Sequence, residues 1–325
     1  MLLQLLVAVL VVCSSLCEAF EFSTTRFTSK SGLPVARYGL GGAARSTQPS
    51  TLPSLYIQEL EENIAPFFFY YNPHRYPDFM KGIKDACRTN REDIFIAGGG
   101  TSRSIASLDQ RLADCLQYCG NEYLDLFILE YVLPDEMETI DENDYSKAEI
   151  GTELLNAIKY CRQWVKDGKV RCIGISTHSH VVGSILANVP DIDTLMLRYG
   201  MSHKEAAEKL SLPTARENDK PVICFTSTRW NSLQDGLGNG QDEFGSNDVP
   251  ASSDCLSFVF GSIHSPPIEF VLHSARDEDE LVKCLSGMKL GFSSSDEEKK
   301  WRAHGKIFED RNDDGFDEYP EERHL

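Results

Sequence analysis

The spacing of apolar residues switches between continuous runs and helical periods along the chain. Residues 170–175 form a nearly continuous apolar run, which is typical of a strand buried on both faces. Before it, residues 153–165 place apolar side chains at helical spacing, and Asp167-Gly168 ends that helix. A polar Ser-Thr-His-Ser segment follows the strand at 176–179. This order predicts one helix–strand unit of a parallel α/β fold, with chemistry at the polar end of the strand.

The same alternation recurs through the chain. The strand-like runs cover residues 35–42, 67–72, 94–97, 124–132, 170–175, 194–199, 222–226 and 268–272. A helical pattern follows each of these eight runs. Strict alternation at this count predicts an α/β fold of the (β/α)8 TIM barrel type, and an open doubly wound sheet is the alternative. In a barrel, functional side chains lie at the carboxyl ends of the strands.

The composition is that of a folded domain with an excess of acidic residues. The chain has 325 residues, of which 41% are hydrophobic and 25% charged, and its formal net charge is −18. This charge argues against nucleic acid or anionic membranes as partners. The expected partner is a small-molecule substrate. Acidic residues crowd the C-terminal end, so residues 291–325 are predicted to be a disordered acidic tail that follows a barrel domain at 31–290.

The N-terminal segment has the pattern of a targeting sequence. Residues 1–19 combine an apolar stretch with small residues and read as a signal peptide, whose removal leaves no stable membrane span. Phe20 follows directly, and residues 20–45 are rich in Ser, Thr, Lys and Arg with one acid, Glu21. This resembles the two-part targeting sequence of algae with complex plastids, in which an Ala-Phe motif marks the cut. We therefore expect a plastid location with a transit segment at 20–30; the endoplasmic reticulum or secretion is the alternative.

The cysteines favour a reducing compartment. Ten are present, and the eight beyond the leader stand singly inside predicted helices and strands, unlike the cysteines of a disulfide scaffold. The chain also contains no Asn-x-Ser/Thr sequon. Cys115 and Cys119, four apart on a predicted helix, are expected in the core and not at a redox or metal site, and no metal site is predicted.

Several segments taken in order resemble the aldo-keto reductase superfamily over roughly residues 28–289. They are Gly39-Leu-Gly-Gly42, Arg91-Glu-Asp-Ile-Phe-Ile-Ala97, Tyr123-Leu-Asp-Leu-Phe-Ile-Leu129, Asp167-Gly-Lys-Val-Arg-Cys-Ile-Gly-Ile-Ser176 and Ser274-Ala-Arg276. The resemblance implies a barrel that reduces carbonyls with NADPH. In that family a Tyr is the general acid, a Lys lowers its pKa, an Asp holds the Lys and a His orients the carbonyl.

This catalytic tetrad is substituted here. The resemblance places Phe69 at the Asp position, Gly99 at the Lys position and Glu130 at the His position. The spacing of the Tyr points to His74, with Tyr71 and Tyr76 close by. Steroid double-bond reductases of the family also carry a Glu at the His position, where a protonated carboxyl donates a hydrogen bond.

A buried Glu130 would keep its proton in the same way. The candidate catalytic residues are therefore Glu130, Tyr71, His74 and Tyr76, and Arg103 or Arg198 is a candidate replacement cation.

The cofactor-binding half of the family pattern is better preserved. Ser176 and Thr177 stand where a Ser-Asn pair binds the nicotinamide amide, and Phe225 where an aromatic ring stacks on the nicotinamide. The residues Thr226 to Arg229 follow as the pyrophosphate loop, although the family's Pro-Leu-Gly is missing. Ser274 and Arg276 match the residues that bind the 2′-phosphate, which would select NADP over NAD.

Three functions are compatible with this pattern. The first is an NADP-dependent oxidoreductase, acting on a carbonyl or conjugated substrate, with a rebuilt proton donor such as Glu130 with Tyr71 or Tyr76. The second is a catalytically silent nucleotide-binding or regulatory protein on the same barrel. The third is a different barrel enzyme that uses Glu130 and His178 as an acid/base pair.

Overall fold

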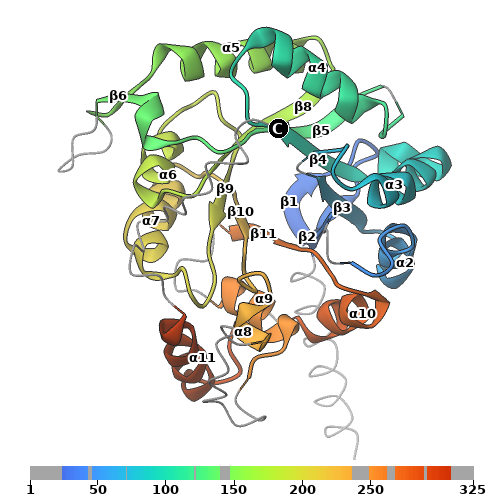
Figure 1. Ribbon diagram of the computed structural model, residues 1–325, viewed down its shortest axis with the longest axis vertical. Helices are drawn as coiled ribbons and strands as arrows, with labels where there is room; N and C mark the ends of the chain where they lie inside the picture. Colours follow the sequence, from blue (N-terminus) through green and yellow to red (C-terminus); the bar gives the residue numbers. More distant parts are fainter. Residues whose placement is uncertain are drawn as a thin grey trace, which may run out of the picture.

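Eight parallel strands close into a barrel, and helices surround it (Figure 1). The computed structural model describes residues 24–42, 46–70, 72–120, 122–139, 147–235, 249–261, 268–288 and 291–308. The barrel strands are β2 (Pro34–Gly41), β3 (Ala65–Tyr70), β4 (Phe95–Gly100), β5 (Leu124–Leu129), β8 (Val170–Thr177), β9 (Thr194–Arg198), β10 (Val222–Phe225) and β11 (Ile268–His273). Pairing of β11 with β2 and of β2 with β3 closes the barrel, which confirms the predicted fold class.

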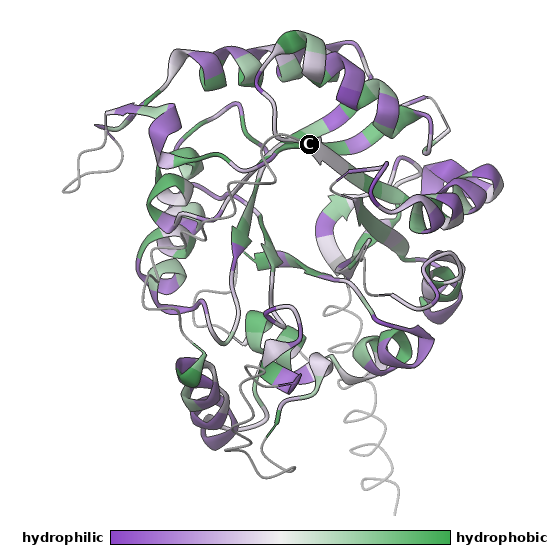
Figure 2. Cartoon of the chain, in the orientation of Figure 1, coloured by the Kyte–Doolittle hydropathy of each residue, from purple (hydrophilic) through white to green (hydrophobic). Residues whose placement is uncertain are grey.

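The interior of the barrel is filled by alternate residues of the strands. Phe67, Phe95 and Phe270 pack together there, with ring centroids 4.7 Å apart for Phe67–Phe270 and 5.4 Å for Phe67–Phe95. The intervening residues, such as Phe68 and Tyr70, face the surrounding helices. Figure 2 shows the strands as mainly hydrophobic, as expected for strands covered on both sides.

The helices follow the predicted alternation. They are α2 (Leu52–Glu59), α3 (Pro77–Asn90), α4 (Ile105–Leu116), α5 (Thr152–Lys166), α6 (His180–Ala187), α7 (Leu212–Glu217), α8 (Ser232–Asp235), α9 (Ser252–Phe260), α10 (Glu278–Gly287) and α11 (Ser295–Ile307). A π-helical turn, Ala207–Ser211, leads into α7, and a short hairpin of β6 (Met137–Thr139) and β7 (Glu149–Ile150) precedes α5. Side chains of Ser104, Ser179, Asp277 and Ser294 cap the first turns of α4, α6, α10 and α11.

The barrel domain begins earlier than the predicted residue 31. Strand β1 (Thr24–Thr28) pairs antiparallel with β2 at the amino end of the barrel. Phe27 packs on Phe95 and Phe270, with ring centroids 5.9 and 5.2 Å apart, and Arg26 bonds Glu269 through its backbone N–H and its Nε. The transit segment expected at 20–30 therefore overlaps a strand of the folded domain. Its hydroxyl-rich composition concealed a strand with one apolar side chain.

The domain also extends beyond the predicted boundary at residue 290. Helix α11 lies inside the segment expected to be a disordered tail, and its Trp301 and the following Phe308 are buried in the outer core. Arg302 anchors the helix by two hydrogen bonds to Glu208, at 2.9 and 3.1 Å. Three acidic residues in its first turn concealed these apolar contacts. The rest of the expected tail, residues 309–325, lies outside the described residues.

Two smaller expectations concern cysteines and membranes. All eight cysteines of the described residues are free, and Cys115 and Cys119 are fully buried, which confirms their place in the core. None of the helices in the described ranges has the length and apolar character needed to cross a bilayer.

Candidate active site

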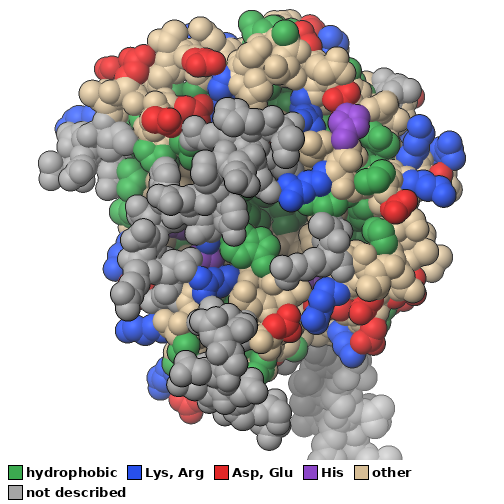
Figure 3. Space-filling model, in the orientation of Figure 1, with side chains coloured by type: hydrophobic (Ala, Val, Ile, Leu, Met, Phe, Trp, Pro, Cys, Tyr) green, Lys and Arg blue, Asp and Glu red, His purple; other side chains and the backbone are tan. Residues whose placement is uncertain are grey.

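A cavity of about 420 Å³ opens at the carboxyl ends of the barrel strands. Figure 3 views this end of the molecule, where basic side chains stand around the central hollow. Residues after β2, β3, β5, β8, β10 and β11 line the cavity. Helix–strand alternation thus brings residues more than 200 positions apart into one site, at the end of the barrel where the pattern predicted it.

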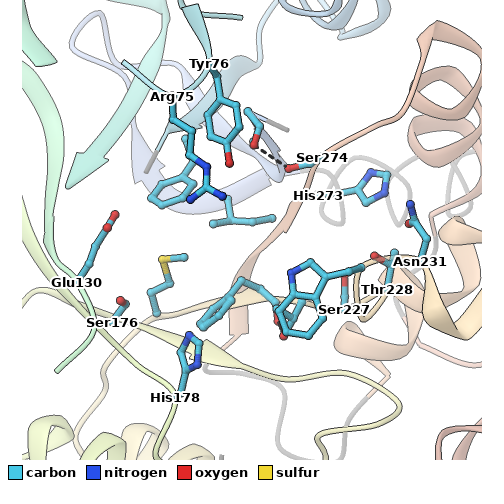
Figure 4. Close-up of a pocket in the computed structure, with 18 of the residues that line it drawn as sticks. Arg75, Tyr76, Glu130, Ser176, His178, Ser227, Thr228, Asn231, His273 and Ser274 are labelled. Atoms are coloured by element: carbon cyan, nitrogen blue, oxygen red, sulfur yellow. Dashed lines mark hydrogen bonds between the residues drawn. The ribbon is translucent and has the colours of Figure 1, made fainter. Parts of the chain in front are cut away.

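Glu130 is the one carboxylate residue that lines this cavity within the described part of the chain. It follows β5 directly, is 2% exposed, and donates its backbone N–H to the Gly100 carbonyl at 2.9 Å. Its carboxyl group lies against Gly99 of β4: a Cβ atom there would be 2.5 Å from Oε1 of Glu130. Glu130 therefore needs a glycine at position 99. Figure 4 shows the Glu130 side chain at the cavity wall.

Neither arginine suggested as a replacement cation lines the cavity. Arg103 is held by Glu136, with Nε–Oε1 at 2.6 Å and Nη2–Oε2 at 3.2 Å, and it donates to the Glu130 carbonyl at 2.9 Å. Arg198 is 1% exposed, and its Nη2 lies 2.8 Å from Nε2 of His203. Both arginines therefore bond residues around the cavity without lining it themselves.

His178 and two aromatic rings form one wall of the cavity. The His178 ring centroid lies 4.6 Å from that of Tyr131 and 5.3 Å from that of Phe225. Burial, and next the charge of Arg198, lower the pKa of His178 to about 3. The imidazole is therefore neutral at physiological pH and cannot serve there as a general acid. Ser176 lines the same wall while its Oγ accepts the Tyr131 N–H at 3.1 Å.

Most of the residues singled out from the sequence meet in this cavity. Those that line it are Tyr76, Glu130, Ser176, Phe225, Thr226, Ser274 and Arg276. Arg75, next to Tyr76, also points into it (Figure 4).

Three others lie elsewhere. His74 turns outward and pairs with Asp114 of α4, Nε2–Oδ2 3.2 Å, because its loop packs on that helix. Thr177 turns its hydroxyl to the Val132 carbonyl at 2.7 Å, which stabilises the turn into α6. Arg229 does not line the cavity either, and Tyr71 is outside the described residues.

The loop after β10 carries site residues that the sequence did not reveal. Ser227, Thr228, Trp230 and Asn231 all line the cavity. Four non-glycine residues of the loop have positive φ, namely Thr226 (57°), Arg229 (48°), Trp230 (52°) and Asn231 (68°). Such strained backbone concentrates at functional sites. Residues 226–231 contain no Gly or Pro, so the sequence gives no signal for this conformation.

A model of the aldo/keto reductase family matches residues 78–255, more than half of the 325-residue chain. The chain belongs to the aldo/keto reductase family. This is a family of oxidoreductases, and the match confirms the resemblance drawn from the sequence. The match does not test the expected substitution of the catalytic tetrad at Phe69, Gly99 and Glu130, which stays a prediction.

Solved structures of aldo-keto reductases share this fold. An aldo-keto reductase of Bacillus halodurans in its holo form superposes with a TM-score of 0.65 at 15% identity, covering 90% of this chain and 99% of that one. A Klebsiella pneumoniae aldo/keto reductase in complex with NADP and acetate gives 0.62 at 14% identity, covering 87% and 95%. A glycerol dehydrogenase of Gluconobacter oxydans gives 0.57 at 17%, covering 87% and 94%. Comparison with curated proteins finds no match.

The residues of the cavity fit a nicotinamide dinucleotide, the cofactor that the fold family implies. Oγ of Ser227 and Nε2 of His273 are buried at its wall and have no hydrogen-bond partner within the described residues. Buried polar atoms of this kind call for a polar ligand. Arg276 also lines the cavity. Its guanidinium forms ion pairs with Glu280 (3.2 Å from Nε) and Asp235 (3.8 Å from Nη1), which partly neutralise its charge.

Proposed function

We propose that this protein is an NADP(H)-dependent oxidoreductase that reduces a carbonyl or conjugated substrate with Glu130 in place of the family's proton donor. The observation that carries the proposal is the buried Glu130 carboxyl, which faces the cavity together with Ser176 and Phe225. Gly99 keeps the space for that carboxyl open. The arrangement supports a carboxyl that donates a hydrogen bond to a substrate oxygen, since burial disfavours the charged carboxylate.

The other wall residues would hold and shield the reactants. When bound, the nicotinamide supplies the electrons of the reduction. Ser176 and Phe225 both line the cavity, and they would hold the nicotinamide amide and stack on the nicotinamide ring, as the resemblance implies. The neutral His178 and the ring of Tyr131 would exclude water from this wall, which strengthens the hydrogen bond of Glu130. Tyr76 offers a second hydroxyl group at the opposite side (Figure 4).

Arg276 and Ser274 would bind the 2′-phosphate and so favour NADP. Both line the cavity, and Arg276 follows β11 at the position that the family uses. A bidentate pairing of the guanidinium with phosphate would supply the selectivity. The Klebsiella pneumoniae relative in complex with NADP supports this assignment.

A catalytically silent nucleotide-binding protein is the second candidate. It is favoured by Phe69 and Gly99, which leave the cavity without the Asp and Lys of the family. In that case Ser176, Phe225, Ser274 and Arg276 would bind a nucleotide, and no reaction would follow.

The decisive experiment combines a fluorescence titration with NADPH and turnover on a panel of aldehydes, ketones and enones. We expect NADPH to bind wild type and Glu130→Gln equally, because Glu130 lies away from the phosphate-binding residues. Glu130→Gln cannot give up a proton and should lose about 10²–10⁴ in rate. Binding without turnover in wild type would establish the silent alternative, and unchanged turnover in Glu130→Gln would clear Glu130 and point to Tyr76.

A further inference from the structure

Arg75 brings a positive charge into the cavity from the loop between β3 and α3. Figure 4 shows Arg75 beside Tyr76, across the cavity from His178. The guanidinium carbon lies 5.8 Å from the centroid of the Tyr76 ring, within the range of a cation–π contact. Arg75 is exposed, so a ligand that enters the cavity can reach it.

The loop that carries Arg75 is held in place on both sides of this residue. Asn72 accepts the His74 N–H with its side-chain oxygen at 2.9 Å and the Arg75 N–H with its backbone carbonyl at 3.0 Å. The side chain of His74 is turned outward by its ion pair with α4. The Tyr76 ring packs on Gly42, where a Cβ atom would lie 3.0 Å from its Cδ2. Arg75 therefore projects from an ordered backbone, which lowers the entropic cost of binding a ligand there.

The charges around the cavity differ between its sides. The charged side chains that line it within the described residues are Arg75, Glu130 and Arg276, because burial lowers the pKa of His178 to about 3 and that of His273 to about 4. Arg276 follows β11 and forms ion pairs with two acidic residues. Glu130 is uncharged when it carries the proton that the proposed function requires. Arg75 thus supplies a positive charge on the β3 side, apart from the residues assigned to the cofactor.

We propose that the substrate is an oxo acid whose carboxylate binds Arg75 while its carbonyl oxygen accepts the hydrogen bond of Glu130. The inference rests on the proposed function, because it names the substrate class of the same site. A guanidinium binds a carboxylate through two parallel hydrogen bonds, and the two charges balance. Phe69, Met196 and Leu272 also line the cavity, which fits an aliphatic chain between the carbonyl and the carboxylate.

Reduction would convert such an oxo acid to a hydroxy acid. The carbonyl carbon gains the hydride that NADPH supplies, and the carbonyl oxygen gains the proton of Glu130, which solvent then replaces. The carboxylate is unchanged, so its pairing with Arg75 serves to bind and orient the substrate. A phosphate ester offers similar oxygens but carries about two negative charges, one more than Arg75 balances.

An NMR titration with pentanoate in the presence of NADPH tests the carboxylate site without catalysis. Pentanoate has no aldehyde or ketone group to reduce, and pentanamide has nearly the same shape without the charge. We expect wild type to bind pentanoate about 10-fold more tightly than pentanamide, the range for hydrogen bonds to a charged group. Arg75→Gln should bind the two equally.

Arg88→Gln is the matched control for this titration. Arg88 is an exposed residue of α3 that pairs with Asp85 at 2.8 Å and does not line the cavity. Its replacement removes the same charge from the same region and should leave the affinity for pentanoate at the wild-type value. Thermal unfolding of each variant checks that it folds.

Turnover gives a second readout, which a merely structural role of Arg75 would not change. Wild type should reduce 4-oxopentanoate with a kcat/KM about 10-fold above that of its methyl ester, and Arg75→Gln should lose this preference through KM. Arg75→Lys should keep part of it, because lysine retains the charge without the planar fork. The KM for NADPH should be the same in all variants.

The outcomes separate this inference from the proposed function. Equal pentanoate affinity in wild type and Arg75→Gln overturns the inference, and turnover of uncharged carbonyls then leaves the proposed function intact. An Arg75→Gln variant that loses affinity for NADPH but not for pentanoate also overturns it. Butyl phosphate that binds wild type more tightly than pentanoate would overturn the choice of a carboxylate. Wild type that reduces no carbonyl refutes the proposed function, and the pentanoate titration still decides the role of Arg75.

Discussion

The contact between Gly99 and Glu130 makes the residue types at these two positions depend on each other. In the structure the carboxyl of Glu130 occupies the space beside Gly99, where even a Cβ atom would lie 2.5 Å from it. The Ile128 carbonyl is equally close to that Cβ position, so the strand backbone also excludes a side chain there. Replacing Gly99 alone by a residue with a side chain, such as lysine, would therefore disrupt β4.

Single residues were predicted where strand register determines their direction. Glu130, Ser176 and Phe225 follow directly from the end of a strand, because the barrel fixes which residues point inward. His74 and Thr177 were misplaced, since their orientation depends on Asp114 and on the Val132 carbonyl, contacts that spacing along the chain does not encode. The orientation of His273 likewise depends on Tyr38, 235 residues away, whose hydroxyl lies 3.0 Å from its Nδ1.

Glu280 places a negative charge beside Arg276, 3.2 Å from its Nε. Burial favours protonation of Glu280, but hydrogen bonds from Ser252 and the backbone of Arg276 outweigh it and lower the pKa, so the group is charged at neutral pH. Glu280→Gln keeps acceptors for Arg276 and removes a negative charge beside the proposed 2′-phosphate. We expect NADPH to bind about 3- to 10-fold more tightly, an effect that salt weakens. Fluorescence titrations should show little change for NADH; an equal gain for both nucleotides would contradict the role of Arg276.

At the scale of elements, the strands and helices of the barrel follow from periodicity, and the terminal elements do not. The eight strands were found because each is a short apolar run between helical patterns. Strand β1 and helix α11 have polar compositions and few buried side chains, so their identity depends on the surfaces that they cover. Composition alone assigned β1 to a transit segment and α11 to a disordered acidic tail.

Phe27 tests the contribution of β1. Its side chain covers the amino end of the barrel next to Phe95 and Phe270. Phe27→Ala should lower the free energy of unfolding by about 1–2 kcal/mol, since the side chain is only partly buried. Thr28→Ala, at an exposed position of the same strand, is the matched control and should change it by less than about 0.5 kcal/mol. Urea unfolding measures both, and equal effects would show that β1 adds no packing.

The position of β1 also limits where the leader is cut. Residues 1–45 fused to a fluorescent reporter should direct it to a plastid, and Phe20→Ala should leave it in the secretory pathway. The mature N-terminus should lie between residues 20 and 24, since a later cut would remove β1. Microscopy and N-terminal sequencing check the two statements; secretion of the wild-type reporter would refute the plastid location.

At the scale of the whole molecule, buried histidines make stability depend on pH. Burial is the largest cause that lowers the pKa of each, from 6.5 to about 3 for His178 and His180, 2 for His203 and 4 for His273. The folded protein keeps them neutral, while the unfolded chain binds protons below pH 6.5. Their stabilising effect is thus present above pH 6.5 and is lost as the pH falls from 6.5 towards 4.

Below pH 6.5 we expect each histidine to lower the free energy of unfolding by up to about 1.4 kcal/mol per pH unit. The four together would lower it by up to about 5 kcal/mol per pH unit. Urea unfolding between pH 7 and 5 measures this slope. In His178→Gln the slope should fall by about a quarter. A slope that is the same in wild type and in His178→Gln would show that folding does not lower the pKa of His178.

Strand β1 and the cavity lie at opposite ends of the barrel. The chain enters at the amino end, where Phe27 covers the barrel interior, and the cavity opens at the other end. A tether joined ahead of Thr24 therefore holds the molecule by its closed base and leaves the mouth facing the solution. The protein can be immobilised in this way on a sensor surface. The cavity of every copy then faces the solution and is accessible to nucleotides and substrates.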